Sequence, residues 1–328
     1  MIDYYNSYFD WNLFRRDVRC DIRNCALLLF LFYAINIGVT GIAGGIIVAA
    51  EMLGAASSAG GVPFDRDLMD IIGGDGIAIL SIIGIIAGSI AFMIRRKGRF
   101  FTDVALPSAE PLRPWIFIIL VVVTQGIQYV SGAATALVEL ALPEDISIVG
   151  NYEDVVGLLI TPAGMIYVVL IGPIFEELIF RGAIMGPLRK YGDNFAILFS
   201  SLLFGLYHAV VLQIPFAFVM GLVLGYACTR WSLRTAIALH IISNGIAMFL
   251  SYDEKFALAG GVGLLFCGVA TLILFFAFRR NLVTRIRAGA AYYGRATYAN
   301  GFSSIAFWLF AATMIGLAAL QLTGFITL

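Results

Sequence analysis

Nine apolar runs, each about as long as a membrane is thick, constrain the fold of this chain of 328 residues more than any other feature. A helix needs about 20 mainly apolar residues to cross the hydrocarbon core of a bilayer. With 61% apolar and 13% charged residues, the composition lies far from that of a soluble domain. We therefore predict an all-α, polytopic transmembrane helix bundle of about eight or nine helices. The predicted spans are residues 26–50, 76–94, 115–138, 155–179, 195–211, 213–230, 233–250, 257–278 and 303–324.

The distribution of charge between the runs predicts the orientation of the bundle. Basic residues precede the first run and follow the second, fourth, sixth and eighth, whereas the intervening loops are acidic. Arg181 is counted here among the basic residues that follow the fourth run. Because lysine and arginine concentrate on the cytosolic side of membranes, the N-terminus is predicted in the cytosol and the C-terminus outside. The short loops and the lack of a targeting signal favour an integral protein of a bacterial plasma membrane.

The polar residues within the runs suggest a division of the chain into three parts. Residues 1–154 would supply a cytosolic segment and three membrane helices, residues 155–252 a four-helix core, and residues 253–328 the C-terminal helices. Within the last part, residues 281–300 are basic and aromatic and are expected to lie along the inner membrane surface. Glycines four residues apart permit close approach of helices in lipid. Such pairs are Gly41/Gly45, Gly84/Gly88 and Gly221/Gly225.

Carboxylate, imidazole and amide side chains inside three of the runs predict a functional site, because such groups are costly in hydrocarbon. The chain has only two histidines, and both lie in apolar runs. Residues four apart share a helix face, so Glu177 can pair with Arg181 while Glu176 is left to face another partner. The polar positions are Glu176 and Glu177 in the fourth run with Arg181 two residues beyond its predicted end, His208 in the fifth, and His240 and Asn244 in the seventh.

This pattern resembles the CAAX-protease and bacteriocin-processing (CPBP, or Abi) family of intramembrane proteases, which includes type II CAAX prenyl endopeptidases. The motifs of the family are Glu-Glu-x-x-x-Arg, Phe-x-x-x-His and His-x-x-x-Asn or -Asp on successive helices. They are intact here from Glu176 to Arg181, from Phe204 to His208 and from His240 to Asn244, within residues 155–250. The resemblance implies hydrolysis of a peptide bond in a membrane-associated substrate. In eukaryotic relatives that substrate is a prenylated protein, which loses its last three residues.

The residue types suit amide hydrolysis, which needs a base to activate water, donors for the oxyanion and an acid for the leaving amine. Glu176 is the predicted general base, and His208 would orient the water or help to activate it. His240 and Asn244 would stabilise the oxyanion. Arg181 would hold Glu177, which becomes a secondary participant.

A metal-dependent mechanism fits the same residues, since two histidines and one glutamate form a common catalytic zinc set. Glu176, His208 and His240 would then be the ligands and Glu177 the base. The sequence does not separate the two mechanisms, so the cofactor is either none or Zn²⁺. The chain lacks a His-Glu-x-x-His helix, the commonest zinc-protease signature, and we favour the metal-free mechanism.

Two other classes of function stay open at this point. A catalytically silent scaffold or bacteriocin-immunity partner would have no need to bury the polar residues, and a proton-coupled transporter could use them as a relay. Broken helices in two repeated halves would support a transporter, but the sequence shows no such repeat. The predicted partners are the lipid bilayer and a membrane-bound protein or peptide substrate, with no nucleic acid.

The predicted depths of the site residues conflict with one another. Glu176 and His240 fall near the cytosolic ends of their predicted helices. His208, however, would lie about 20 Å along a helix that starts at residue 195, at a rise of about 1.5 Å per residue. Either the fifth helix starts well outside the bilayer core, or the fourth helix carries Glu176 deeper than residues 155–179 would place it.

Overall fold

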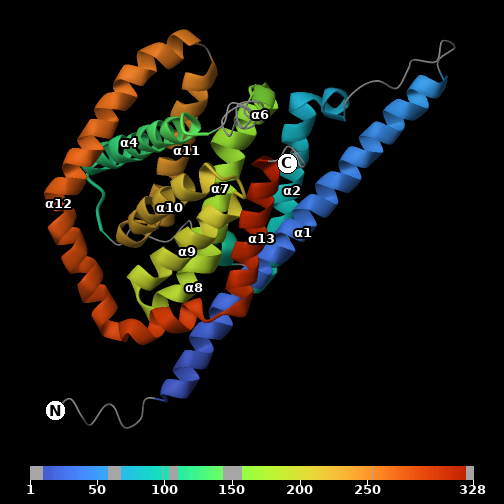
Figure 1. Ribbon diagram of the computed structural model, residues 1–328. Coiled ribbons are helices and arrows are strands. Elements are labelled where there is room, and N and C mark those ends of the chain that lie inside the picture. Colours follow the sequence, from blue (N-terminus) through green and yellow to red (C-terminus); the bar gives the residue numbers. More distant parts are fainter. Residues whose placement is uncertain are drawn as a thin grey trace, which may run out of the picture.

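The protein is an all-α helix bundle, seen here in a computed structural model (Figure 1). The structure describes residues 10–57, 68–97, 99–102, 110–142, 157–252 and 254–322, and within these ranges it contains no strand. Seven of the described helices are long and apolar enough to cross a membrane, and an eighth span results if a bent pair near the C-terminus is counted. The predicted fold class is confirmed, and the chain is an integral, multi-pass membrane protein.

The N-terminal helices are α1 (Trp11–Ser57), α2 (Leu68–Arg96), the short α3 (Arg99–Thr102) and α4 (Pro114–Glu139). They lie on different sides of the bundle: α1 packs against α2, whereas α4 packs against helices from the C-terminal half of the chain (Figure 1). Helices α1 and α2 approach closely because α2 carries glycine at the contact: a Cβ atom at Gly88 would lie 2.7 Å from the Phe32 ring. The predicted close approach of another helix is not found at Gly41 and Gly45, where an added Cβ atom would meet nothing within 4 Å.

The fourth span is one long helix, Pro162–Tyr191, in which α-helical turns alternate with wider π-helical turns. Each π-helical segment is followed by a Gly-Pro pair, at positions 172–173 and 186–187. Proline cannot donate a backbone hydrogen bond, and π-helical turns are one way in which a membrane helix accommodates it. The segments are α6 (Pro162–Ile166), η2 (Tyr167–Ile171), α7 (Gly172–Glu177), η3 (Leu178–Met185), α8 (Gly186–Leu188) and η4 (Arg189–Tyr191).

The predicted end of this span at residue 179 is wrong, because the helix continues to Tyr191. The prediction took Arg181 as a marker of the membrane surface. Arg181 is only 2% exposed, however, and its Nε lies 3.1 Å from Glu177 Oε2, so its charge is balanced inside the bundle. Glu176 therefore lies in the middle of a long helix. This deeper position resolves the conflict in depth in favour of the second explanation.

The fifth helix, α9 (Asp193–Tyr207), is shorter than the predicted span 195–211. Its 15 residues would extend about 22 Å at 1.5 Å per residue, less than the roughly 30 Å of a hydrocarbon core. It packs against η3 and α10 (Gln213–Arg230), and a Cβ at Gly221 would lie 3.0 Å from Ser201 Cβ. A glycine at this position therefore permits the close crossing of α9 and α10.

The remaining helices follow α10 in the chain. Helix α11 (Leu233–Tyr252) starts at the residue predicted for the seventh span. Helix α12 (Glu254–Phe302) curves around the outside of the bundle and bends at Gly294, whose φ of 64° favours glycine (Figure 1). It leads to α13 (Ile305–Leu322). The prediction of three separate parts stays a prediction, as does the membrane-surface location of residues 281–300, which are helical here.

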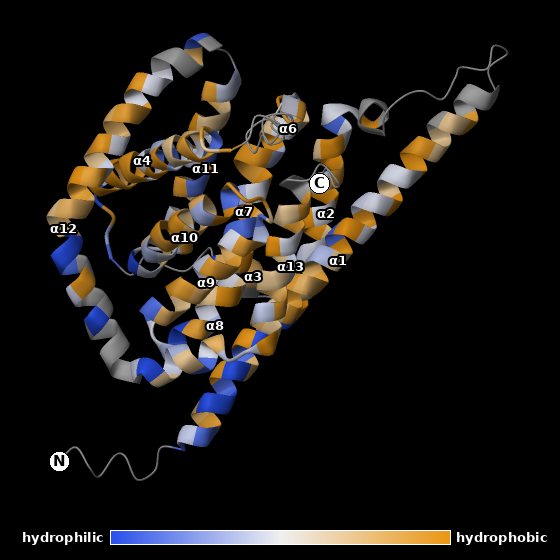
Figure 2. Cartoon of the chain, in the orientation of Figure 1, coloured by the Kyte–Doolittle hydropathy of each residue, from blue (hydrophilic) through white to orange (hydrophobic). Residues whose placement is uncertain are grey.

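Hydrophilic residues gather at one end of the molecule, at the start of α1, around α8 and along the lower part of α12 (Figure 2). At this end Lys190 Nζ lies 2.8 Å from Asp21 Oδ2, and the Tyr191 hydroxyl donates a hydrogen bond to the same oxygen at 2.7 Å. These contacts tie the end of the fourth span to α1. The cytosolic location of this end remains a prediction from the basic residues.

Candidate active site

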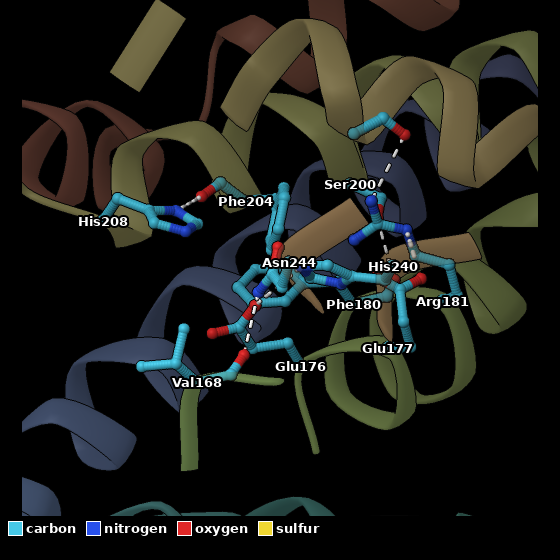
Figure 3. A network of polar contacts seen from close by, with 11 residues as sticks. Val168, Glu176, Glu177, Phe180, Arg181, Ser200, Phe204, His208, His240 and Asn244 are labelled. Atoms are coloured by element: carbon cyan, nitrogen blue, oxygen red, sulfur yellow. Dashed lines mark hydrogen bonds and ion pairs between the residues drawn. The ribbon is translucent and has the colours of Figure 1, made fainter. Parts of the chain in front are cut away.

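The three sequence motifs meet where α7, η3, α9 and α11 come together (Figure 3). The first motif lies on the α7–η3 part of the long helix, the second on α9 and the third on α11. The ring of Phe204 lies at the centre of the group: its centroid is 4.5 Å from Arg181 Cζ, 4.8 Å from the His208 ring and 5.9 Å from the His240 ring. Helix packing thus brings together residues that are far apart in the sequence.

Glu177 lies at the centre of a buried polar network. Its side chain is 0% exposed, and its two oxygens have different partners. Oε2 lies 3.1 Å from Arg181 Nε, and Oε1 lies 3.0 Å from His240 Nδ1. Arg181 Nη2 also donates a hydrogen bond to the Gly221 carbonyl of α10 at 3.3 Å. The network therefore connects the long helix with α10 and α11.

Glu176, the adjacent carboxylate, has different surroundings. Its side chain is 14% exposed, and its Oε2 lies 3.8 Å from His240 Nε2. The imidazole of His240 is thus held between two carboxylates, close to Glu177 on its Nδ1 side and farther from Glu176 on its Nε2 side. Glu176 shows no arginine or lysine partner among the described residues. It is the more accessible carboxylate of the pair.

His208 lies at the end of α9 and keeps one ring nitrogen available. Its Nδ1 is 2.8 Å from the Phe204 carbonyl oxygen, which can only accept, so Nδ1 carries the proton and Nε2 is left as the free nitrogen. The next residue, Ala209, is buried and has a φ of 50°, a left-handed conformation that costs a non-glycine residue roughly 1–2 kcal/mol. This sharp turn ends α9 directly after the histidine.

Asn244 contacts the backbone of the long helix. Its Nδ2 donates a hydrogen bond of 3.0 Å to the Val168 carbonyl oxygen in η2. Since an amide nitrogen has two hydrogens, one N–H remains for another acceptor. One turn earlier on the same helix, Ser243 Oγ accepts a hydrogen bond of 3.3 Å from the buried Gln125 Nε2 of α4.

Three tyrosines at the site, Tyr33 of α1, Tyr167 of η2 and Tyr207 of α9, were missed by the sequence analysis. The ring centroids of Tyr207 and His208 lie 5.5 Å apart, and a Cβ atom at Gly172 would lie 4.0 Å from both Glu176 Oε1 and the Tyr167 ring. The rings of Tyr33 and Tyr207 have centroids 5.4 Å apart. Tyr207 could have been suspected as the neighbour of His208, but nothing in the sequence connects Tyr33 with a motif more than 140 residues away.

The predicted zinc ligands do not form a metal site in this arrangement. Among the described residues, which include Glu176, His208 and His240, no three histidine, cysteine, aspartate or glutamate side chains converge as metal ligands do. Within the set, Glu176 Oε2 and His240 Nε2 lie 3.8 Å apart, and His208 donates through Nδ1 to the Phe204 carbonyl, which leaves its Nε2 as the nitrogen that could bind an ion. The three side chains as they stand do not converge on one point, so no catalytic step is derived through an ion.

These features define a polytopic membrane protein with a polar site of glutamate, histidine and asparagine side chains inside its helix bundle. Residues 159–246, which contain all three motifs, match the family model described as Rce1-like, type II CAAX prenyl endopeptidase Rce1-like. The match confirms the family predicted from the motifs and supports a CAAX-type intramembrane endopeptidase in general. No curated protein and no solved structure matches the chain.

Proposed function

We propose that this protein hydrolyses a peptide bond in a membrane-associated protein or peptide by means of a water molecule activated by Glu176. The observation that carries the proposal is the unequal surroundings of two adjacent carboxylates. Glu177 is sealed between Arg181 and His240, whereas Glu176 is partly exposed and has no such cation beside it among the described residues. Glu176 is therefore free to exchange a proton with a water molecule.

In the proposed reaction, Glu176 takes a proton from the water while the water oxygen adds to the carbonyl carbon of the scissile bond. The carbon–nitrogen bond then breaks, and Glu176 returns the proton to the leaving amine, so that the carboxylate is regenerated. The free Nε2 of His208 supplies a hydrogen-bonding group for the water. Both carboxyl and amine products form without any other reactant.

The developing oxyanion needs hydrogen-bond donors that are already oriented. His240 is held through its Nδ1 by Glu177, which leaves Nε2 on the side of Glu176. With a hydrogen on Nε2 the imidazole would be one donor to the oxyanion, and the remaining N–H of Asn244 would be a second one.

The sealed Glu177–Arg181 pair would act by holding His240 and not by touching the substrate. The same intact network favours an enzyme over a silent scaffold, which has no need of a second carboxylate placed beside a histidine. A proton-coupled transporter could use the same groups, but the sequence lacks the repeated halves that would support one. A membrane-bound substrate and a bacterial plasma membrane remain parts of this proposal.

The test is cleavage of membrane-anchored peptides by the full chain reconstituted in vesicles. Glu176→Gln should lower the rate by about 10²–10⁴-fold, the range expected for loss of a general base. The matched control is Glu110→Gln, which removes the charge of an exposed glutamate paired with Arg230 and should leave cleavage unchanged. Full cleavage by the Glu176 variant would refute the proposed base. Loss of activity with a chelator and recovery with zinc would refute the metal-free mechanism.

A further inference from the structure

The carbonyl group of Val168 has no donor of the α-helical or π-helical kind within its own helix. An α-helical bond to this carbonyl would come from the N–H of Gly172, but that N–H is bonded to the Tyr167 carbonyl instead. A π-helical bond would come from position 173, where the residue is proline and has no N–H. Pro173 therefore leaves one backbone acceptor of the membrane helix for a partner outside the helix.

That partner is Asn244 on α11, whose Nδ2 donates to the Val168 oxygen at 3.0 Å (Figure 3). An unpaired backbone group is expensive in a membrane, and side chains of neighbouring helices are one source of the missing donor. The hydrogen bond thus follows from the proline, and it fixes α11 against the long helix at one place.

The residues that produce this contact lie about one helical turn from the proposed catalytic groups. Asn244, the donor, is four residues after His240, and Pro173, which leaves the Val168 carbonyl unpaired within the helix, is three residues before Glu176. Both residues therefore lie close to the pair whose Oε2 and Nε2 atoms are 3.8 Å apart. A change in how α11 sits on the long helix would change that separation.

We propose that Pro173 is a positioning residue. Its missing N–H makes the Val168 carbonyl the acceptor for Asn244, and the resulting contact sets the position of His240 relative to Glu176. The effect on catalysis rests on the proposed protease function, whereas the contact itself does not. Asn244 then has two roles: one N–H of its amide holds α11 against the long helix, and the other is left for the oxyanion.

The other Gly-Pro pair of the same helix provides a matched control. Gly186 N–H bonds the Arg181 carbonyl five residues back, as Gly172 does with Tyr167, and Pro187 follows directly. Asn244 donates its hydrogen bond to Val168 in η2, the π-helical segment before the first Gly-Pro pair. Pro187→Ala therefore repeats the same chemical change on the same helix without supplying a donor to Val168.

The experiment is a double-mutant cycle on the full chain in detergent, read by thermal unfolding and by peptide cleavage in vesicles. Asn244→Ala should lower Tm by about 2–4 °C, as expected for one buried acceptor left unpaired. In the Pro173→Ala background the same change should lower Tm by less than half as much, because the new N–H can reach Val168. Pro173→Ala alone should lower kcat about threefold or more with KM unchanged, because the Val168 carbonyl no longer needs Asn244, and it should not lower the kcat of Asn244→Ala any further.

Equal losses of Tm in the two backgrounds would overturn the proposal, as would the same effects on Tm and kcat with Pro187→Ala in place of Pro173→Ala. Coupling in Tm together with the fall in kcat of Pro173→Ala would support it in full. Coupling in Tm in a protein that cleaves no peptide would support the Pro173–Asn244 contact and refute the protease function. The two failures are therefore distinguishable.

Discussion

The two sides of the candidate site are held in place in different ways. On one side, Glu177, Arg181 and His240 form a buried network in which each residue contacts another helix or another charge. On the other side, His208 is bonded through Nδ1 to the carbonyl of its own helix, four residues back, and Nε2 stays free. The side chains of the first side are held by contacts between helices, whereas His208 is held within its own helix and keeps Nε2 for a reactant.

This difference separates structural from chemical roles within one short motif. Adjacent glutamates on a helix point about 100° apart, so one can face the interior of the bundle while its neighbour faces an accessible region. Glu177 and Glu176 are such a pair, with side-chain exposures of 0% and 14%. Each of the following substitutions changes one side and tests whether the other responds.

The largest loss of stability is expected when Glu177 loses its cation. Arg181→Leu would leave a fully buried carboxylate with only His240 beside it, and breaking a buried pair in this way costs about 3–5 kcal/mol. Thermal unfolding in detergent measures the effect. The control is Arg189→Leu, which breaks an exposed pair with Asp193 and should cost at most about 1 kcal/mol. Equal effects of the two variants would contradict the structural role of Arg181.

The same substitution at the two adjacent glutamates sharpens the comparison. Glu177→Gln removes the charge that both Arg181 and His240 face, so we expect a fall in Tm together with a fall in cleavage. Glu176→Gln should abolish cleavage but shift Tm by only about 1–2 °C, because its nearest cationic partner is a histidine 3.8 Å away. Thermal unfolding curves and cleavage rates of the two purified variants measure these differences. A greater loss of stability at Glu176 would reverse the assigned roles.

A smaller effect is expected from removing the free imidazole. His208→Ala should lower cleavage about 10²-fold, the lower end of the range for a group that assists proton transfer. Its hydrogen bond is local to α9, so Tm should change by no more than about 1–2 °C. Rates and unfolding curves of the same preparation provide both numbers. Unchanged cleavage would remove His208 from the proposed mechanism.

Much of the fold and the site could be predicted because both depend on local patterns. Apolar runs of span length indicated the helices, and the starts of α4, α10 and α11 lie within one residue of the predictions. The three motifs identified the polar residues that the bundle brings together. Spacing alone was enough for the Glu177–Arg181 pair, since residues four apart share a face.

The errors arose where distant parts of the chain determine the structure. Arg181 was taken for a membrane-surface residue because its positive charge is visible in the sequence, whereas its burial depends on Phe204 of α9 and Gly221 of α10. The partner of the Val168 carbonyl could not be predicted either, because Asn244 lies more than 70 residues further along the chain. The two Gly-Pro pairs inside an apolar run were the available signal for the π-helical turns.

The smallest effect is expected at Ala209, where the backbone and not a side chain holds His208 in place. A left-handed residue that ends a helix is most often glycine, and a β-branched side chain is poorly tolerated there. Ala209→Gly should therefore change Tm by less than about 2 °C and keep cleavage, since relief of strain offsets the added flexibility. Ala209→Val should lower both more clearly. If the valine variant equalled the glycine variant in unfolding and in cleavage, the turn after Tyr207 would have no part in positioning His208, and the weaker side of the site would depend on the Phe204 contact alone.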